Sequence, residues 1–281
     1  MDAPDALGAD MTLITPTELA AMMASPTPPV VLDMRWGGPA APGSGRAEFE
    51  DGHIPRSQWV STDEELADLS KPGGRHPLPD RDAFQAAMRR HGVRQDRPVV
   101  ALDGAESLSA GRLWWLLTDA GFPEVLVLDG GFAAWQAAGL PVQEGPAEPV
   151  ATGDAVVGPP QLPVVDAADI AGVSRNIWDV RTPERFRGET EPIDPVAGHV
   201  PGAHNLSARG AHRPDGRFKP ADELQRVFAD VRPGDVVYCG SGVTASQVLL
   251  AMHIAGIDGV RLYPGSWSDW ISDPSRPVAR G

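Results

Sequence analysis

The chain has 281 residues, of which 42% are hydrophobic, and its 38 acidic and 24 basic residues give a formal net charge of −14. This length favours two domains, and the lack of an apolar run of about 18 residues argues against a membrane-spanning helix. The dispersed negative charge argues against nucleic acids and anionic membranes as partners, so we expect neither.

The first half of the chain alternates between helical and extended patterns. The capping box Thr15-Pro16-Thr17-Glu18 predicts the start of a helix, which ends before the proline-rich residues 26–29. Residues 30–32 form an apolar run that predicts a buried strand, and a loop then leads to a Gly-His-Ile-Pro motif at 52–55. Later segments predict helices at 84–90 and 108–119 and strands at 99–102 and 125–128.

The second half repeats the motifs of the first half in the same order. An Asp-x-Arg motif at 33–35 recurs at 179–181, and the Gly-His-[Ile/Val]-Pro motif at 52–55 recurs at 198–201. The strand before the single cysteine and a glycine motif that ends in tryptophan also have counterparts in the first half. Four anchors in one order indicate a tandem duplication.

The two halves are predicted to form separate domains. A stretch with many prolines and little periodicity, residues 143–163, is expected to be a semi-rigid linker. It separates an N-terminal domain, residues 10–142, from a C-terminal domain, residues 164–281. Because strands alternate with helical patterns in each half, we expect two α/β domains, each with a central parallel sheet flanked by helices.

Cys239, the single cysteine of the chain, excludes an internal disulfide and a cluster of thiolates around a metal. An apolar strand, residues 236–238, ends at this cysteine, and the loop Gly240-Ser241-Gly242 then leads into a helix. The backbone amides of such a loop and the helix dipole favour an anion at its centre. A lone cysteine is often a small buried hydrophobe, but the glycines of this loop favour a reactive thiolate, and we predict that Cys239 is a nucleophile.

The corresponding loop of the first half has no nucleophile. Asp103 stands at the position of the cysteine, and Glu106 adds a second acid to the loop. We therefore expect the N-terminal domain to be catalytically inactive and to form one wall of a cleft at the domain interface.

These motifs, together with Cys239-Gly240-Ser241-Gly242-Val243-Thr244-Ala245, resemble the two-domain rhodanese family, the thiosulfate and 3-mercaptopyruvate sulfurtransferases. The resemblance implies two rhodanese-like folds and one active site, in the second domain. It also implies ping-pong sulfur transfer, in which Cys239 takes a sulfane sulfur from a small anionic donor and becomes a persulfide. The persulfide then passes its outer sulfur to cyanide, a thiol or thioredoxin.

The residues after the cysteine bear on the donor. Thiosulfate-preferring members of the family typically have arginine and lysine at the second and third loop positions, where this chain has Gly240 and Ser241. The resemblance therefore implies 3-mercaptopyruvate as the donor. Four loop residues are expected to bind it: Gly240, Gly242, Val243 and Thr244.

The resemblance also implies a proton relay through a serine, a histidine and an acid. Ser241 matches the serine, and His53 of the Gly-His-Ile-Pro motif is the candidate histidine. Because His199 repeats this histidine in the other half, a structural role for His53 is the alternative. The sequence does not place the acid.

Arg185 matches the family's arginine for the substrate carboxylate, a task that suits a bidentate guanidinium. A surface ion pair is the alternative role for this side chain. The family's second substrate arginine has no counterpart in residues 191–195, and the candidates to replace it are Arg46, Arg187 and Arg209.

Three other functions are open at this point. A thiosulfate sulfurtransferase would use the same persulfide. A cysteine phosphatase needs an arginine six residues after the cysteine, where this chain has Ala245. A non-catalytic sulfur carrier or binding module would not need the intact loop around Cys239.

The remaining expectations concern location and assembly. Residues 1–5 carry acid rather than the basic region of a signal peptide, which predicts a cytoplasmic protein. The seven histidines lack the spacing of metal ligands, so we expect no metal, and nothing implies another cofactor. We expect a monomer.

Overall fold

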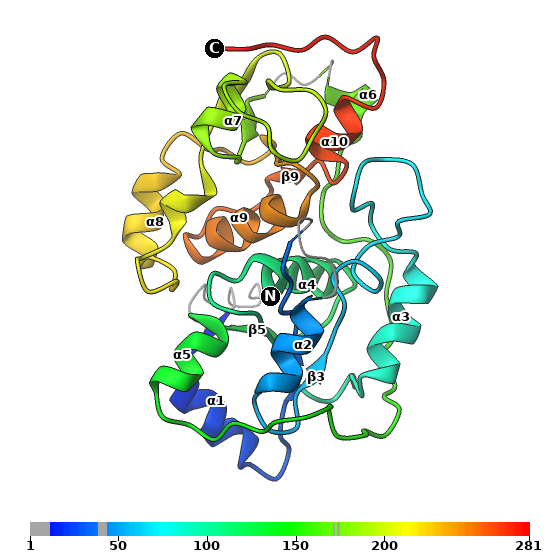
Figure 1. The fold of residues 1–281 in the computed structure, drawn as a ribbon, viewed down its shortest axis with the longest axis vertical. Helices are drawn as coiled ribbons and strands as arrows, with labels where there is room; N and C mark the ends of the chain where they lie inside the picture. The colour runs from blue at the N-terminus through cyan, green and yellow to red at the C-terminus, as the bar shows by residue number, and fades with distance from the viewer. Residues whose placement is uncertain (1–11, 39–43, 171, 173–174) are drawn as a thin grey trace, which may run out of the picture.

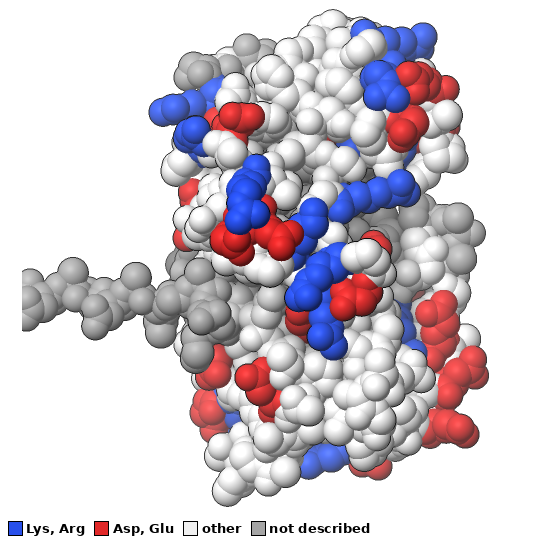
Figure 2. All heavy atoms as spheres, turned by 90° about the vertical axis from the view of Figure 1, so that its left-hand side faces the viewer, with Lys and Arg blue, Asp and Glu red and all other residues white. Residues whose placement is uncertain are grey.

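The structure, a computed structural model, describes residues 12–38, 44–170, 172 and 175–281. The chain folds into two α/β units, which are stacked along the long axis of the molecule in Figure 1. On the face shown in Figure 2, acidic and basic side chains are interspersed, and several of both kinds lie at the boundary between the units. In the described part of the chain, no helix is long and apolar enough to cross a membrane.

The N-terminal unit contains a five-stranded parallel sheet in the order β1-β5-β4-β2-β3. Most of its apolar strand residues are buried, which explains the continuous rather than alternating hydrophobic runs in the sequence. The strands are β1 (Leu13–Ile14), β2 (Val30–Asp33), β3 (Gln58–Trp59), β4 (Val99–Leu102) and β5 (Val125–Leu128). The helices are α1 (Pro16–Met23), α2 (Ser44–Asp51), α3 (Arg81–Arg90), α4 (Leu108–Asp119) and α5 (Gly131–Ala137).

The C-terminal unit repeats this topology. Its parallel sheet has the order β7-β6-β8-β9, and Val164 forms a parallel bridge to Leu262 where β1 pairs with β5 in the first unit. The strands are β6 (Ile177–Asp179), β7 (Ala203–Asn205), β8 (Val236–Tyr238) and β9 (Arg261–Leu262). The helices are α6 (Ala167–Ile170), α7 (Pro183–Arg187), a 3₁₀ helix (Ala208–Ala211), α8 (Ala221–Val227), α9 (Val243–Ile254) and α10 (Ser266–Trp270). The predicted pair of α/β folds is confirmed.

Local sequence signals account for most of the element boundaries. Helix α1 begins with the predicted capping box, in which Thr15 and Glu18 exchange hydrogen bonds. Helix α3 begins three residues earlier than predicted because the Asp80 side chain accepts hydrogen bonds from the N–H groups of residues 82 and 83. Helix α4 and strands β4 and β5 have the predicted bounds.

The repeated Asp-x-Arg motifs make the same stabilising contacts in both halves. The Arg35 guanidinium binds Asp33 and donates 2.6 Å to the carbonyl oxygen of Gly52, and Arg181 makes the same pair of contacts with Asp179 and Gly198. Each Asp-x-Arg motif therefore ties the end of a central strand to the start of the Gly-His-[Ile/Val]-Pro motif. These arginines are almost fully buried, which is tolerated because each is paired and hydrogen-bonded.

Helices α4 and α9 form the interface between the two units, as Figure 1 shows. Gly111 makes the close approach possible, because a Cβ atom there would lie 2.7 Å from the Cα atom of Gln247. Side chains of both helices share one continuous apolar core, in which Leu117 and Ala251 are fully buried. This shared core fixes the position of one unit against the other.

The segment between the units contains no helix or strand and lies along the N-terminal unit. The carbonyl oxygens of Ala155 and Val156 accept hydrogen bonds from Arg89 and Gln95, and Ala155 is fully buried. These contacts hold the segment in place although its own residues lack periodic structure.

Candidate active site

Cys239 follows strand β8 and lies at the bottom of a tight loop. Its Sγ atom accepts a hydrogen bond of 3.1 Å from the N–H group of Gly242, and its own N–H group donates to Ser266 Oγ. Gly242 has a φ of +84°, and a Cβ atom there would lie 2.4 Å from the carbonyl oxygen of Pro264. Only glycine therefore fits at this turn, and the turn aims a backbone amide at the sulfur.

Helix α10 hydrogen-bonds to the backbone of the cysteine loop. The N–H groups of Trp267 and Ser268 donate to the carbonyl oxygens of Cys239 and Gly240, both at 3.0 Å. The first unit has the same two bonds, from residues 132 and 133 to residues 103 and 104. The repeated glycine and tryptophan motif thus positions the loop in both halves.

A cleft of about 670 Å³ opens over Cys239 and is lined by both units. The C-terminal unit contributes four of the predicted loop residues: Gly240, Ser241, Val243 and Thr244. Gly242 does not line the cleft, but its N–H group contacts the sulfur from within the loop. Arg185 lines the cleft as predicted, and the N-terminal unit adds Trp36, Arg75 and Glu106.

Ser241 belongs to a chain of three hydrogen-bonded side chains that crosses the interface. Its Oγ atom lies 2.8 Å from Nδ1 of His76, and Nε2 of His76 lies 3.0 Å from Oδ1 of Asp63. Trp36 donates to the other oxygen of Asp63 and packs edge-on against the imidazole. A carboxylate only accepts, so Nε2 carries the proton and Nδ1 is free to accept the Ser241 hydroxyl proton.

Burial lowers the pKa of His76, and the hydrogen bond to Asp63 only partly opposes this effect. The imidazole is therefore uncharged at neutral pH and is able to act as a base toward Ser241. The geometry is that of a proton relay, with one end in the cleft beside Cys239.

The structure corrects the choice of His53 as the relay histidine. His53 is fully buried in the N-terminal unit, where it stacks on Phe49 and donates from Nδ1 to the carbonyl oxygen of that residue. His199 makes the equivalent contacts with Phe186 in the other unit. Both histidines therefore have a structural role that the duplication preserved, and His76 is the histidine that contacts Ser241.

The acid and histidine of the relay were missed because they lie in an irregular loop. Residues 60–80 contain no helix or strand and no hydrophobic period, so the sequence offers no placement for Asp63 and His76. The available signal was the string Gly73-Gly74-Arg75-His76-Pro77, which places two functional side chains in a glycine-rich turn.

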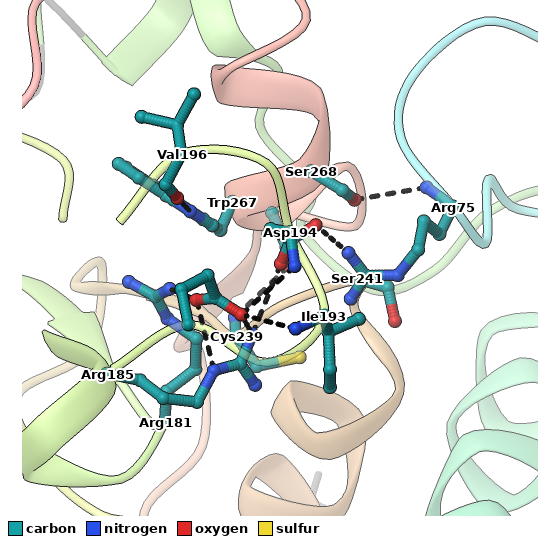
Figure 3. A network of polar contacts seen from close by, with 12 residues as sticks. Arg75, Arg181, Arg185, Ile193, Asp194, Val196, Cys239, Ser241, Trp267 and Ser268 are labelled. Atoms are coloured by element: carbon teal, nitrogen blue, oxygen red, sulfur yellow. Dashed lines mark hydrogen bonds and ion pairs between the residues drawn. The ribbon is translucent and has the colours of Figure 1, made fainter. Parts of the chain in front are cut away.

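Two arginines flank the first loop glycine from opposite units. A Cβ atom on Gly240 would lie 2.8 Å from a terminal nitrogen of Arg75 and 3.6 Å from one of Arg185. Asp194 lies between these arginines and is ion-paired with both, as Figure 3 shows. The second arginine beside Gly240 is therefore Arg75 of the N-terminal unit. It does not come from residues 191–195, the segment before the Gly-His-Val-Pro motif.

Of the three candidates for the second substrate arginine, one lines the cleft and two do not. Arg46 is exposed and pairs with Glu50, and Arg187 is exposed and pairs with Glu189. Neither lines the cleft. Arg209 does line it, together with His212 and Arg213.

The loop of the N-terminal unit is also an anion cradle, and its own aspartate fills it. The Asp103 carboxylate accepts hydrogen bonds of 2.9–3.2 Å from four backbone N–H groups, those of residues 105, 107, 109 and 110. The sulfur of the second unit and the carboxylate of the first therefore occupy equivalent loops. The first unit kept the cradle without a nucleophile.

Asp103 provides a test through the pH dependence of stability. Burial raises its pKa from 3.8 to about 6, although hydrogen bonds from the amides of residues 107, 109 and 110 oppose the shift. The folded protein thus binds this proton more tightly than the unfolded chain, so the stabilising contribution is complete below pH 3.8 and is lost as the pH rises through 6. We expect the wild type to lose about 2 kcal/mol more stability between pH 4 and pH 7 than Asp103→Asn does.

Urea unfolding at several pH values would measure this difference. The slopes of unfolding free energy against pH decide the outcome, because the amide also changes the absolute stability of the variant. Parallel slopes for the two proteins would contradict the assignment.

Comparison with known proteins supports a single family. The sequence profile of the rhodanese-like domain matches residues 15–138 and 165–273. SseB of Mycobacterium tuberculosis, provisionally named a thiosulfate sulfurtransferase, is 41% identical over 96% of this chain and 97% of its own length. A Pseudomonas aeruginosa protein, provisionally named a 3-mercaptopyruvate sulfurtransferase, is 41% identical over 96% of this chain and 98% of its own.

A solved structure agrees with these sequence matches. The crystal structure of SseA from Escherichia coli, described as a 3-mercaptopyruvate sulfotransferase, superimposes with a TM-score of 0.80 at 32% identity. The match covers 91% of this chain and 98% of SseA, so both units and their arrangement are similar in the two proteins.

Proposed function

The chain belongs to the rhodanese family and is a sulfurtransferase, and from this premise we propose that it takes sulfur from 3-mercaptopyruvate onto Cys239. The observation that carries the choice of donor is the Ser241–His76–Asp63 relay beside the sulfur. When the carbon–sulfur bond of this donor breaks, the pyruvate fragment leaves as a carbanion and needs a proton. The relay has a free proton acceptor at the cleft, so it is able to take up a proton and deliver it to this carbon.

The first half-reaction balances with one proton passed through the relay. The Cys239 thiolate attacks the sulfur of 3-mercaptopyruvate, the sulfur–sulfur bond forms, and the carbon–sulfur bond breaks with its electron pair going to carbon. The proton that was on the donor's sulfur moves to this carbon, which gives pyruvate and the Cys239 persulfide anion. Ser241 and His76 take up one proton and return it, so the enzyme is left unchanged in protonation.

The second half-reaction needs no proton from the enzyme. An anionic acceptor such as cyanide or a thiolate attacks the outer sulfur, and the sulfur–sulfur bond breaks with its electron pair going to Cys239. The Gly242 amide, at 3.1 Å from the sulfur, and the N-terminus of helix α9 support both the persulfide and the released thiolate. Thioredoxin is an acceptor of the same chemistry, because it presents a reactive thiolate.

Mass spectrometry tests the proposal directly. After incubation with 3-mercaptopyruvate and no acceptor, the peptide that carries Cys239 is expected to gain one sulfur atom, and cyanide is expected to remove it. A protein that consumes 3-mercaptopyruvate without this adduct would contradict the mechanism.

Thiosulfate is the second candidate donor, because the two arginines beside Gly240 are also suited to a sulfonate. Thiosulfate releases sulfite, which already carries its charge on oxygen and needs no proton on carbon. The relay would then have no task in donor cleavage. Steady-state rates with both donors distinguish the two functions, and a tenfold preference for thiosulfate in kcat/KM would overturn the choice of 3-mercaptopyruvate.

Arg185 is proposed to hold the carboxylate of the donor. Loss of a charged hydrogen-bond donor typically weakens an interaction by a factor of roughly 10 to 100. We expect Arg185→Ala to raise KM for 3-mercaptopyruvate by this factor and to leave the acceptor half-reaction almost unchanged. Single-turnover reaction of the preformed persulfide with cyanide measures the second part.

The matched control for this variant is Arg187→Ala. Arg187 lies on the same helix, α7, but is exposed and paired with Glu189 away from the cleft. Its replacement is expected to leave KM unchanged. An unaltered KM in Arg185→Ala would remove Arg185 from the donor site.

A further inference from the structure

The ionic network beside Cys239 has no surplus of positive charge. Figure 3 shows its side chains around the cysteine loop. Each arginine of the network is paired with at least one carboxylate within 3.2 Å. Three arginines, Arg75, Arg181 and Arg185, are balanced by three carboxylates, Asp179, Glu191 and Asp194. An anionic donor that enters this network, close to Cys239, adds a negative charge to a group of side chains that is already neutral.

The three carboxylates are held very differently. Asp179 is fully buried under Arg181, and its Oδ1 atom also accepts the backbone N–H group of that residue. Glu191 accepts from Arg181 and Arg185 and from the backbone N–H groups of Ile193 and Asp194. These two carboxylates are therefore held in place by hydrogen bonds from the neighbouring backbone.

Asp194 has no such backbone contacts. Its carboxylate contacts only Arg75 on one oxygen and Arg185 on the other, among the described residues. It lies on a segment, residues 189–197, that contains no helix or strand and that begins and ends next to glycines with positive φ, at 188 and 198. Its side chain therefore bridges the two units through ion pairs alone.

We propose that Asp194 is an internal anion that occupies the donor's carboxylate position between Arg75 and Arg185 and is displaced when the donor binds. The proposal rests on the proposed function in assigning an anionic donor to this cleft. The two guanidiniums that meet at Gly240, beside the loop that carries the thiolate, are the same two that Asp194 neutralises.

Two features of Arg75 agree with an exchange of anions. The Nε atom of its guanidinium is buried without a hydrogen-bond partner among the described residues. Asp194 therefore uses only some of the N–H donors of this guanidinium, and one donor remains for a second carboxylate. Its backbone N–H group donates to Ser268 Oγ on helix α10, which keeps the base of the side chain in place when the ion pair opens. The exchange therefore requires movement of the Asp194 side chain and not of Arg75.

The consequence for the enzyme is weaker binding of anions than two arginines would give by themselves. A bare pair of guanidiniums would hold the anionic product as well as the donor, and the competing carboxylate speeds release of the product. Asp194 also keeps the two units bridged over the cleft in the absence of donor. In this role it sets affinity for the anionic group, which makes it a specificity-determining residue.

Protection of Cys239 from alkylation tests the proposal without any turnover. Iodoacetamide modifies the thiol, and an anion between the two arginines is expected to slow this reaction. The variant Asp194→Asn keeps the size of the side chain and removes its charge. We expect the concentration of pyruvate that gives half-protection to fall about tenfold in Asp194→Asn, which is within the usual range for coupling between two sites.

The control variant is Glu189→Gln, which removes an exposed carboxylate from the same segment without touching the cleft. It is expected to leave half-protection unchanged. A half-protection concentration in Asp194→Asn that is equal to or higher than that of the wild type would overturn the proposal and would assign Asp194 to holding the arginines in position. Protection by pyruvate in the variant alone would support it.

Failure of the proposed function has a different signature. If 3-mercaptopyruvate gives no persulfide, the choice of donor is wrong, while protection by pyruvate and by sulfate still reports whether Asp194 competes with anions. Thermal unfolding of both variants shows whether the fold is retained. A Tm of Asp194→Asn within a few degrees of the wild type confirms that half-protection reflects the site.

Discussion

Replacement of Cys239 by serine is expected to abolish sulfur transfer to every acceptor, with a loss of roughly 10⁴-fold or more. The chain has no second cysteine that could carry the sulfur. A serine hydroxyl is ionised far less than a thiol at neutral pH and cannot form a persulfide. The measurements are steady-state transfer to cyanide and the mass of the protein after exposure to 3-mercaptopyruvate.

The fold is expected to survive this substitution. The contacts between this loop and helix α10 come from the N–H and C=O groups of residue 239, and serine is close to cysteine in size. The Tm of Cys239→Ser is therefore expected to stay within a few degrees of the wild type. Transfer activity retained by a well-folded variant would refute the persulfide mechanism.

Replacement of His76 by glutamine is expected to separate the two donors. We expect kcat/KM for 3-mercaptopyruvate to fall by about 10²- to 10⁴-fold, the usual contribution of a general acid or base. Glutamine can bond to Ser241 but cannot take up and return a proton. Thiosulfate, whose leaving group needs no proton on carbon, is expected to lose much less activity with the same variant.

The matched control for His76→Gln is His53→Gln. His53 stacks on Phe49 in the interior of the N-terminal unit, so its replacement is expected to lower Tm and to change both donors' rates by the same factor. Equal losses for both donors in His76→Gln would show that His76 only supports the structure of the interface.

The relay also predicts the pH dependence of the first half-reaction. Burial keeps the pKa of His76 below its ordinary value of 6.5, so the imidazole is mostly uncharged at pH 6.5 and above. The acid limb of kcat/KM for 3-mercaptopyruvate is therefore expected below pH 6.5. Ser241→Ala should remove this limb, and adding it to His76→Gln should cost little more, because the two residues act as one unit.

The local pattern of residues was sufficient for most of the elements and for the loop that contains Cys239. Apolar runs, capping residues and glycines act through hydrogen bonds and burial within a few residues of themselves, so the strand, the turn and the helix around Cys239 follow from their own sequence. The duplication could be read from four repeated motifs, and it extended this local information to the whole topology of two parallel sheets.

The same duplication also misled the search for the relay. His53 belongs to a repeated motif, and the repeat itself indicated a structural role, because a catalytic histidine is not needed twice. In the structure both copies stack on a phenylalanine and hydrogen-bond to its carbonyl group.

Only the tertiary structure decided which side chains surround the sulfur. His76 and Ser241 are 165 positions apart in the chain, and Arg75 and Asp194 are 119 positions apart. Each pair is brought together by the packing of α4 against α9, which depends on Gly111 and on the apolar side chains of the shared core. No local sequence pattern predicts these contacts between the units, because residues in an irregular loop have no period that fixes the direction of their side chains.

The sequence by itself therefore determined the two α/β units, the position of Cys239 at the end of a strand and the uncharged loop after it. The structure decided that the N-terminal unit, which has Asp103 at the position equivalent to Cys239, places Asp63, His76 and Arg75 at the cleft. The physical reason is that a strand or a turn is stabilised by its neighbours in sequence, whereas a relay or an ion pair between units is stabilised only when both units are packed.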